Sequence, residues 1–485
     1  MAKHTFLPEG ANFVQTVQPL RIGGKSFDRA DRLEVLNPSD GKPLATIARA
    51  GRDETGAAIA AAKAAFDDGS RTTMSAHDRG RIVWNLADAI EDNVEALAQL
   101  DTLDNGKPHE KARGDVEWSA RHFRYFAGWP DQIEGATIPV STPDRLKYTR
   151  ISPVGVCGLI TPLNYPLSMA SWKLAPGNTV VLKPSEETSL SALYFADPAL
   201  EAGLPPSVLN VIPGYGRDAG AVLAAHDHVA KIGFTGSNNV GRHIVAASTG
   251  NLKKVSLELG GKAGNVIFED ADLDRAIPGA FWANFGNNGQ SCMAGARLYI
   301  HENVYDQVRD GIVALAKGIS VGPGLDQPGH DLGPVINERQ MTKILGYVEG
   351  AVAEGASILT GGTRQGREGW FILPTVIDAV EDRMTIACEE VFGPVLTLHR
   401  FNDDADVVAR VNATPYGLAV GLWSRDITRL RRMADALLAG TIWVNCWGET
   451  DAASPFGGMK QSGYGREMGK DAIELYSETK SIWLA

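Results

Sequence analysis

Cys292 stands out among the four cysteines of this 485-residue chain because of its neighbours. It lies in "NNGQSCMAGAR" (287–297), among Gly, Ser, Ala and amide side chains. A cysteine attacks as its thiolate, so a working nucleophile must be reachable, ionisable and beside space for a substrate. The small neighbours supply space, and we expect a helix N-terminus here to favour ionisation. Cys292 is therefore the candidate nucleophile, whereas Cys157, in the apolar run "VGVCGLI", is expected to be a core thiol.

A general base for this nucleophile is best sought among the carboxylates. The ten histidines are scattered, and none lies in a recognisable motif. Glu258 lies in "LELGGK", shortly before Gly260 and Gly261. A partly desolvated carboxylate at that strand end would have a raised pKa and could act as a general base. An ordinary solvated glutamate fits the position alone equally well.

Three Gly- or Lys-containing stretches could hold a dinucleotide. "GFTGSNNVG" (233–241) follows an apolar run and opens a helix, whose N–H groups can hold a phosphate. "GYGRDAG" (214–220) is one residue longer than the G-x-G-x-x-G pattern, and a plain turn before a helix explains it as well. In "KPSEET" (183–188) a lysine and a glutamate could bind a ribose, although Ser185 could instead cap a solvated helix start.

Short β-branched runs separated by helix-like segments predict the elements that position these residues. The expected strands of a first unit are 154–161, 178–184, 207–214, 229–236 and 253–261. Near-continuous apolar strands alternating with helices indicate a parallel sheet covered on both faces, which binds ligands at its carboxyl edge. A second set, at 296–301, 394–401, 417–424 and 440–445, implies a second α/β domain. The first hundred residues are expected to be largely helical, most clearly over 57–68 and 79–103.

Composition excludes several classes of protein. Lys plus Arg is 47 and Asp plus Glu is 58, a net charge of -11 that argues against nucleic-acid or anionic-membrane partners. No apolar stretch reaches the length of a membrane span, and the first residues lack the pattern of a signal peptide. Four cysteines in so long a chain do not form a disulfide framework. A cytoplasmic enzyme is therefore expected.

Six motifs, in this order along the chain, resemble those of the NAD(P)-dependent aldehyde dehydrogenase superfamily. They are "KPSE", "GFTGS", "LELGGK", "GQSCMAG", "EEVFGPV" (389–395) and "PFGGMKQSGYGRE" (455–467). The resemblance covers nearly the whole chain. It implies NAD as cofactor, with NADP weaker, and a small aldehyde as substrate.

The resemblance also implies roles for individual residues. Cys292 matches the nucleophile, Glu258 the base that activates water, and Asn164 the oxyanion donor. Lys173 matches a lysine linked to proton transfer. The implied cofactor-binding residues are Ile160, Thr161, Pro162, Leu163, Lys183, Ser185, Glu186, Gly216, Gly220, Phe234, Gly236, Ser237, Val240, Leu259, Gly260, Glu390 and Phe392. No metal site is expected.

The fold implied by the resemblance has three parts. They are a Rossmann-type dinucleotide-binding domain (1–131 and 152–257), an α/β catalytic domain (258–460) and a small β oligomerisation element (132–151 and 461–485). The last part is expected to pair a β-hairpin with the C-terminal strand. Family members are dimers or tetramers, so a homo-oligomer is expected.

Two positions depart from the family pattern. The stretch "SWKLAPGNTVVLKP" is shorter by about four residues, which puts the placement of Lys183 and Glu186 relative to Asn164 in question. Leu163 stands where the family usually has Trp, which removes a rigid side chain beside the cofactor.

The aldehyde tunnel is the least determined part of the site. The family positions that line it are here Tyr165, Met169, Trp172, Phe285, Cys446, Trp447 and Phe456. Two tryptophans and a tyrosine could enclose a cation, and "NCWGE" (445–449) resembles betaine-aldehyde and aminoaldehyde dehydrogenases. The same residues suit apolar or aromatic aldehydes, the class we favour.

Three other functions remain open at this point. A CoA-acylating dehydrogenase would not need Glu258. A catalytically silent binding protein would not need the set of Cys292, Glu258 and Asn164. A plain thioester or ester hydrolase would not explain "KPSE" or "EEVFGPV".

Overall fold

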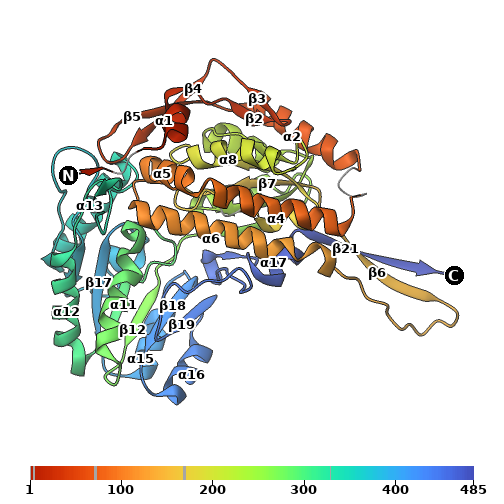
Figure 1. Cartoon of the computed structure of the whole chain (residues 1–485). Coiled ribbons are helices and arrows are strands. Elements are labelled where there is room, and N and C mark those ends of the chain that lie inside the picture. The colour runs from red at the N-terminus through yellow and green to blue at the C-terminus, as the bar shows by residue number, and fades with distance from the viewer. Residues whose placement is uncertain (1, 4–5, 70–73, 168–170, 328) are drawn as a thin grey trace.

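The computed structural model describes residues 2–3, 6–69, 74–167, 171–327 and 329–485, with the backbone alone at Ala2, Lys3, Trp172 and Gln327. Two mixed sheets form its body, and a two-stranded ribbon projects from it (Figure 1). The expected residue Met169 lies outside the described residues, and so does the side chain of Trp172.

The first sheet joins segments from the start, middle and end of the chain. Its strand order is β20 (Gly463–Tyr464), β11 (Lys254–Glu258), β10 (Val229–Thr235), β7 (Val156–Ile160), β8 (Thr179–Lys183), β9 (Leu209–Val211), β2 (Leu20–Ile22) and β3 (Lys25–Phe27). The run from β11 to β9 is parallel. Strands β20 and β2 are antiparallel to their neighbours in this run, and β3 is antiparallel to β2.

Both faces of this sheet are buried, which explains why its central strands are apolar throughout. On one face Cys157 and Leu159 join a core built with α4, α5, α6 and α8, and on the other Val156 and Ile160 join a core built with α2, α9 and α10. Cys157 is therefore a buried core thiol, as expected. The covering helices are α2 (Arg52–Asp67), α4 (Ala76–Asp92), α5 (Val94–Asn105), α6 (His109–Ala127), α8 (Leu190–Glu201), α9 (Ala221–Ala225) and α10 (Asn238–Ala247).

The second sheet forms the other half of the body. Its order is β15 (Ser357–Thr360), β16 (Thr375–Asp378), β17 (Val395–Phe401), β13 (Arg297–His301), β12 (Gly264–Ile267), β18 (Ala419–Trp423) and β19 (Thr441–Val444), parallel except for β15. Around it lie α11 (Leu273–Phe285), α12 (Tyr305–Gly318), α13 (Glu338–Ala353), α14 (Thr385–Cys388), α15 (Asp404–Asn412) and α16 (Ile427–Ala436).

The projecting ribbon pairs β6 (Leu146–Pro153) with β21 (Ser477–Leu484) in antiparallel register. Smaller pairs are β4 (Arg32–Asn37) with β5 (Lys42–Ala48) and β1 (Ala2–Lys3) with β14 (Asp326–Gln327). The remaining helices are α1 (Pro8–Gln15), α7 (Ser171–Leu174) and α17 (Gly469–Leu475).

The expected strands of both sheets agree with the structure to within a few residues, but two features differ. The single helix expected over 79–103 is broken at Asn93 into α4 and α5. Strands β2 to β5 lie in a region where we expected mainly helix. Within the described residues no helix has both the length and the apolar character needed to span a membrane.

Candidate active site

The carboxyl edge of the first sheet brings several of the expected residues together. In the parallel register, Thr235 of β10 lies beside Glu258 of β11. Ile160 of β7 lies between Phe234 of β10 and Lys183 of β8. Strands β11, β10, β7 and β8 therefore end at the same edge of the sheet. Ligands of open parallel sheets bind at this edge because the connecting loops leave a crevice there. The candidate base and the candidate ribose-binding lysine are therefore parts of one crevice.

Two glycines carry the chain from the first sheet to the second through this crevice. A Cβ atom on Gly261 would lie 2.2 Å from the carbonyl oxygen of Cys292, and one on Gly260 would lie 2.5 Å from an oxygen of Glu390. Any side chain at either position would collide with the nucleophile loop or with Glu390. The absence of side chains at Gly260 and Gly261 therefore allows the nucleophile loop and Glu390 to approach the end of β11.

The loop that carries Cys292 is not a helix N-terminus, so that expectation is wrong. Helix α11 ends at Phe285, and the next residues include Asn287, Asn288 and Gly289 with φ values of 51°, 58° and 67°. Consecutive left-handed residues turn the chain sharply and cannot start a right-handed helix. Cys292 thus lies in an irregular segment between α11 and β13.

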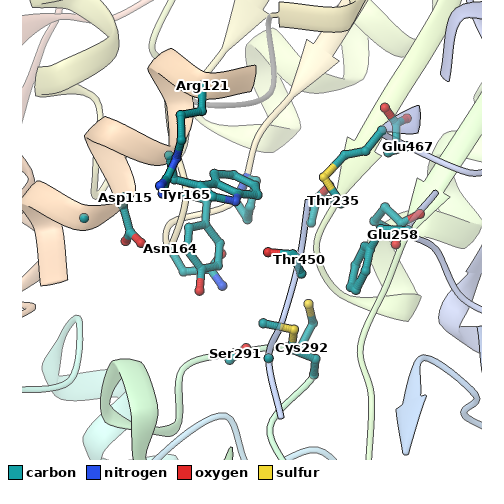
Figure 2. Close-up of a pocket in the computed structure, with 17 residues that line it drawn as sticks. Asp115, Arg121, Asn164, Tyr165, Thr235, Glu258, Ser291, Cys292, Thr450 and Glu467 are labelled. Atoms are coloured by element: carbon teal, nitrogen blue, oxygen red, sulfur yellow. The ribbon is translucent and has the colours of Figure 1, made fainter. Parts of the chain in front are cut away.

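Cys292, Glu258 and Asn164 surround one cavity of about 310 Å³ (Figure 2). They come from the loop before β13, the end of β11 and the segment after β7. The lining consists of Gly114, Asp115, Trp118, Arg121, Pro162, Asn164, Tyr165, Thr235, Glu258, Ser291, Cys292, Met293, Gly448, Thr450, Phe456, Glu467 and Met468. The tertiary structure therefore assembles the expected nucleophile, carboxylate and amide around a space open to a small molecule.

Glu258 is a buried carboxyl group, and the charges of Arg466 and Lys173 offset only part of the effect of its burial. Neither of its oxygens has a hydrogen-bond partner within the described residues. Burial, with the nearby negative charge of Glu467, raises the pKa of Glu258 well above the usual range of a glutamate. A carboxyl group in this state can take up a proton near neutral pH, which is the property required of a general base.

The thiol of Cys292 is protonated in this arrangement. Burial, with the charges of Glu390 and Glu258, raises the pKa of Cys292 to about 12. Glu390 is close because its Oε1 accepts a hydrogen bond from the Gly261 N–H at 3.0 Å. Movement of Glu390 away from Gly261 would remove one of the charges that oppose formation of the thiolate.

Lys173 lies behind the cavity rather than on its wall. Its Nζ donates to Oε2 of Glu467 at 3.1 Å, and both side chains are buried. Burial lowers the pKa of Lys173 to about 8 although Glu467 opposes the shift. Glu467 lines the cavity together with Glu258, so Lys173 contacts the site through this carboxylate.

Asn164 is held from two directions. Its Nδ2 donates to the carbonyl oxygen of Gln290 at 3.1 Å, which ties it to the nucleophile loop. Its own carbonyl oxygen accepts a hydrogen bond at 2.8 Å from the fully buried Nζ of Lys107. The same Nζ donates to Asp115 at 2.7 Å and lies 5.2 Å from the centre of the Tyr165 ring. Lys107 therefore links three residues of the cavity wall.

A second cavity, of about 530 Å³, lies beside the end of β8 and suits the adenosine half of a dinucleotide. Its lining is Leu36, Glu186, Glu187, Tyr215, Gly216, Arg217, Asn337, Glu338, Arg339 and Trp370. Lys183 pairs with Glu186 at 3.2 Å beside it. No atom lies within 4 Å of the place where a Cβ of Gly216 would stand, so this backbone is open to a ligand. These features fit a bound nucleotide.

Most of the remaining expected cofactor residues lie at or just after the ends of the strands of the first sheet, whereas Phe392 lies before β17 of the second sheet. Ser237 caps α10 by accepting from the Val240 N–H, and Gly236 donates to the carbonyl oxygen of Glu258. Phe392 has a φ of 56° in the loop after Glu390. Leu163, in the usual place of Trp, is partly buried, and its carbonyl oxygen accepts from Asn105 at 2.8 Å. The others are Ile160, Thr161, Pro162, Ser185, Gly220, Phe234, Leu259 and Gly260.

The shortened segment does not displace the end of β8. Thr179 to Lys183 pair with β7 in regular register. The hydrogen bonds of the sheet therefore determine where Lys183 lies.

Three of the expected tunnel residues lie away from the cavity lining. Phe285 is fully buried and stacks on Phe281 with ring centroids 4.6 Å apart, so it belongs to the core and not to a tunnel wall. Trp447 packs on Trp443 at 4.9 Å and, with Cys446, joins a small apolar cluster. Tyr165 and Phe456 do line the cavity.

Sequence reasoning missed the wall that α6 contributes. Gly114, Trp118 and Arg121 have the i, i+4, i+7 spacing of one helix face, and Asp115 lies beside them. That spacing indicates, from the sequence alone, that the three residues share one face of a helix. Glu467 was present in a recognised motif but was given no role. Within the described residues no group of three or more His, Cys, Asp or Glu could hold a metal ion.

Comparison with known proteins shows the family of this chain. The profile of the aldehyde dehydrogenase family matches residues 26–482. The chain is 46% identical over 455 residues to the mitochondrial aldehyde dehydrogenase of Homo sapiens, covering 92% of this chain and 88% of that protein.

Solved structures of aldehyde dehydrogenases also resemble this chain. The NAD+ complex of an aldehyde dehydrogenase from Bacillus cereus has a TM-score of 0.98 and 41% identity, covering 100% of this chain and 99% of that one. A betaine aldehyde dehydrogenase from Staphylococcus aureus in complex with NAD+ has a TM-score of 0.95 and 36% identity, covering 100% and 97%. The chain belongs to the aldehyde dehydrogenase family and is an oxidoreductase that oxidises aldehydes with NAD.

Proposed function

We propose that Cys292 attacks aldehydes with an apolar or aromatic body, and that Glu258 completes the reaction by activating water. The observation that carries this is the convergence of Cys292, Glu258 and Asn164 on one cavity with an aromatic wall. Trp118, Tyr165 and Phe456 form that wall.

In the first step the thiol proton of Cys292 passes to water, and the sulfur bonds to the aldehyde carbon. The carbonyl electron pair moves to oxygen, and the resulting oxyanion needs donors in place before the reaction begins. The amide of Asn164 and the backbone N–H of Cys292 are the donors we assign. The bond between Asn164 and Gln290 keeps that amide next to the nucleophile loop.

In the second step the thiohemiacetal is oxidised and then hydrolysed. Bound NAD would supply the hydride acceptor, and loss of the hydride from the substrate carbon would leave a thioester on Cys292. Glu258 removes a proton from water, the hydroxide attacks the thioester carbon, and the thiolate leaves. Lys173 and Glu467, paired behind Glu258, are positioned to pass that proton on.

The charges on the wall distinguish the favoured substrate class from a cationic one. Asp115 is a carboxylate of the same cavity lining, and its Oδ2 accepts a hydrogen bond from Lys107 at 2.7 Å, so its charge is already compensated. Arg121 adds a positive charge to the same wall. The remaining support for a cationic aldehyde is the likeness to a betaine aldehyde dehydrogenase.

A screen of NADH formation with aliphatic, aromatic and trimethylammonium aldehydes tests this proposal. We expect neutral aromatic and medium-length aliphatic aldehydes to exceed the trimethylammonium aldehyde in kcat/KM by about tenfold or more, because each 1.4 kcal/mol of unfavourable interaction costs a decade. A trimethylammonium aldehyde that exceeded both would reverse the assignment. CoA-dependent turnover would point to an acylating enzyme.

The residues around the ribose site predict the preference between NAD and NADP. A 2′-phosphate beside Glu186 would place like charges a few ångströms apart, at a cost on the order of 1–4 kcal/mol at intermediate dielectric. Lys183, which pairs with Glu186, offsets part of this. We expect NAD to exceed NADP by about tenfold or more in kcat/KM. Glu186→Ser should narrow this gap mainly by improving NADP.

Saturation curves for both cofactors with one aldehyde measure this preference. Glu187→Ser is the matched control, since Glu187 adjoins Glu186 in the same cavity and is engaged by Asn337 at 2.9 Å. Equal use of the two cofactors by the unmodified protein would contradict the role of Glu186.

We also infer a homodimer or homotetramer assembled through the ribbon of β6 and β21. Leu146, Trp483 and Leu484 of this ribbon are each about half exposed, at 50%, 53% and 49%. Apolar side chains on a projecting two-stranded ribbon need a partner surface to be buried. We assign the first sheet with its helices to cofactor binding, and the second sheet with its helices to catalysis. Light scattering of the purified protein measures the oligomeric state, and a monomer would contradict the inference. The cytoplasmic location stays a prediction.

A further inference from the structure

The cavity wall contains a positive charge that the chain itself does not neutralise. Arg121 extends from α6 toward Tyr165 (Figure 2) and lines the cavity that contains Cys292. Within the described residues Arg121 has no hydrogen bond or ion pair. Neighbouring arginines on the same helix differ, because Arg113 pairs with Glu117 at 3.1 Å and Arg124 with Asp88 at 2.7 Å.

The other charges of the wall do not account for Arg121. The charge of Asp115 is compensated by the buried Lys107. Glu258 is buried at the end of β11, and Glu467 is buried and bonded to Lys173, Ser256 and Tyr476. An exposed guanidinium that faces an aromatic cavity can bind a planar carboxylate through two parallel hydrogen bonds.

We propose that this enzyme prefers aldehydes that carry a carboxylate at the far end from the aldehyde, and that Arg121 recognises this group. The aromatic side chains Trp118, Tyr165 and Phe456 would contact the body between the two ends. The proposal rests on the proposed function and narrows its substrate class. Gly114, one helical turn from Trp118 on the same wall, leaves room there, since no atom lies within 4 Å of its absent Cβ.

The test compares substrates that differ only at the far end. Para-carboxybenzaldehyde, benzaldehyde and para-trimethylammonio-benzaldehyde form one set, and aliphatic semialdehydes with alkanals of equal length form another. We expect the carboxylated member to have the highest kcat/KM, by about tenfold over the neutral one, as a charge-assisted hydrogen bond predicts. The preference should fall as ionic strength rises, because the guanidinium is exposed.

Variants of Arg121 distinguish recognition of the substrate carboxylate from a purely steric role of this side chain in the cavity wall. Arg121→Met should lower kcat/KM for the carboxylated aldehyde about tenfold more than for the neutral one, and Arg121→Lys should retain part of the preference. Arg113→Met is the matched control, because Arg113 lies on α6 outside the cavity lining, and it should keep the preference of the unmodified enzyme.

The outcomes are distinguishable. Equal losses for carboxylated and neutral aldehydes in Arg121→Met would overturn the recognition role and leave Arg121 as a part of the wall. A higher kcat/KM for neutral or cationic members in the unmodified enzyme would overturn the substrate class. Failure of every aldehyde in every variant would instead reject the proposed function.

Discussion

Replacement of Cys292 by alanine is expected to abolish aldehyde oxidation, lowering NADH turnover by several orders of magnitude. The change removes the atom that bonds to the aldehyde carbon, and no other thiol lines the same cavity within the described residues. The fold should tolerate it, since alanine is smaller than cysteine and Gly261 contacts the backbone of residue 292, not its side chain. Binding of NAD should persist.

Cys388→Ala is the control for this experiment. Cys388 is an exposed thiol at the end of α14, bonded to the carbonyl oxygen of Asp382, so its loss should leave turnover intact. NAD binding by titration calorimetry shows whether each variant is folded. If Cys292→Ala kept even a tenth of the activity, the covalent role would have to be abandoned.

Substitution of Glu258 by glutamine should separate the two halves of the reaction. The first turnover, which needs the thiol, should still release NADH in a burst. Steady-state turnover should then fall by about a hundredfold or more, because general-base catalysis contributes on the order of 10²–10⁴-fold. The thioester on Cys292 should accumulate, and intact-protein mass spectrometry would detect the added acyl group.

The environment of Glu258 also determines the pH dependence of the unmodified enzyme. Because burial and Glu467 raise the pKa of Glu258, the carboxylate form needed for deacylation is lost as the pH falls through that raised value. The high pKa of Cys292 acts in the same direction. Steady-state turnover should therefore increase from mildly acidic to mildly alkaline pH, and Glu258→Gln should flatten the profile.

A stopped-flow trace distinguishes this role from the alternatives. A burst followed by a slow phase supports deacylation by Glu258, whereas normal steady-state turnover would exclude it. Loss of both burst and turnover at alkaline pH would instead assign Glu258 to the first step. Glu474→Gln, on the exposed face of α17, is a matched change outside the cavity and should behave as the unmodified enzyme.

The sequence by itself determined the central strands and the chemistry at their ends. Strands β7 and β8 could be predicted because both faces of a covered parallel sheet are apolar, so each strand is a short continuous apolar run. The motifs around Glu258 and Cys292 were visible because close backbone approach requires glycine at fixed positions, such as Gly260 and Gly261. These constraints are local, and a single sequence displays them.

The tertiary structure decided which side chains form the cavity wall. Trp118 and Arg121 face the cavity because of how α6 packs on its neighbours, and Phe285 belongs to the core because α11 packs on β13 and β17 of the second sheet. The turn from Asn287 to Gly289, not a helix start, presents Cys292. The contacts of Lys107 with Asn164 and Asp115 join segments remote in sequence. The spacing of Trp118 and Arg121 places them on one face of a helix, but only long-range packing decides what that face contacts.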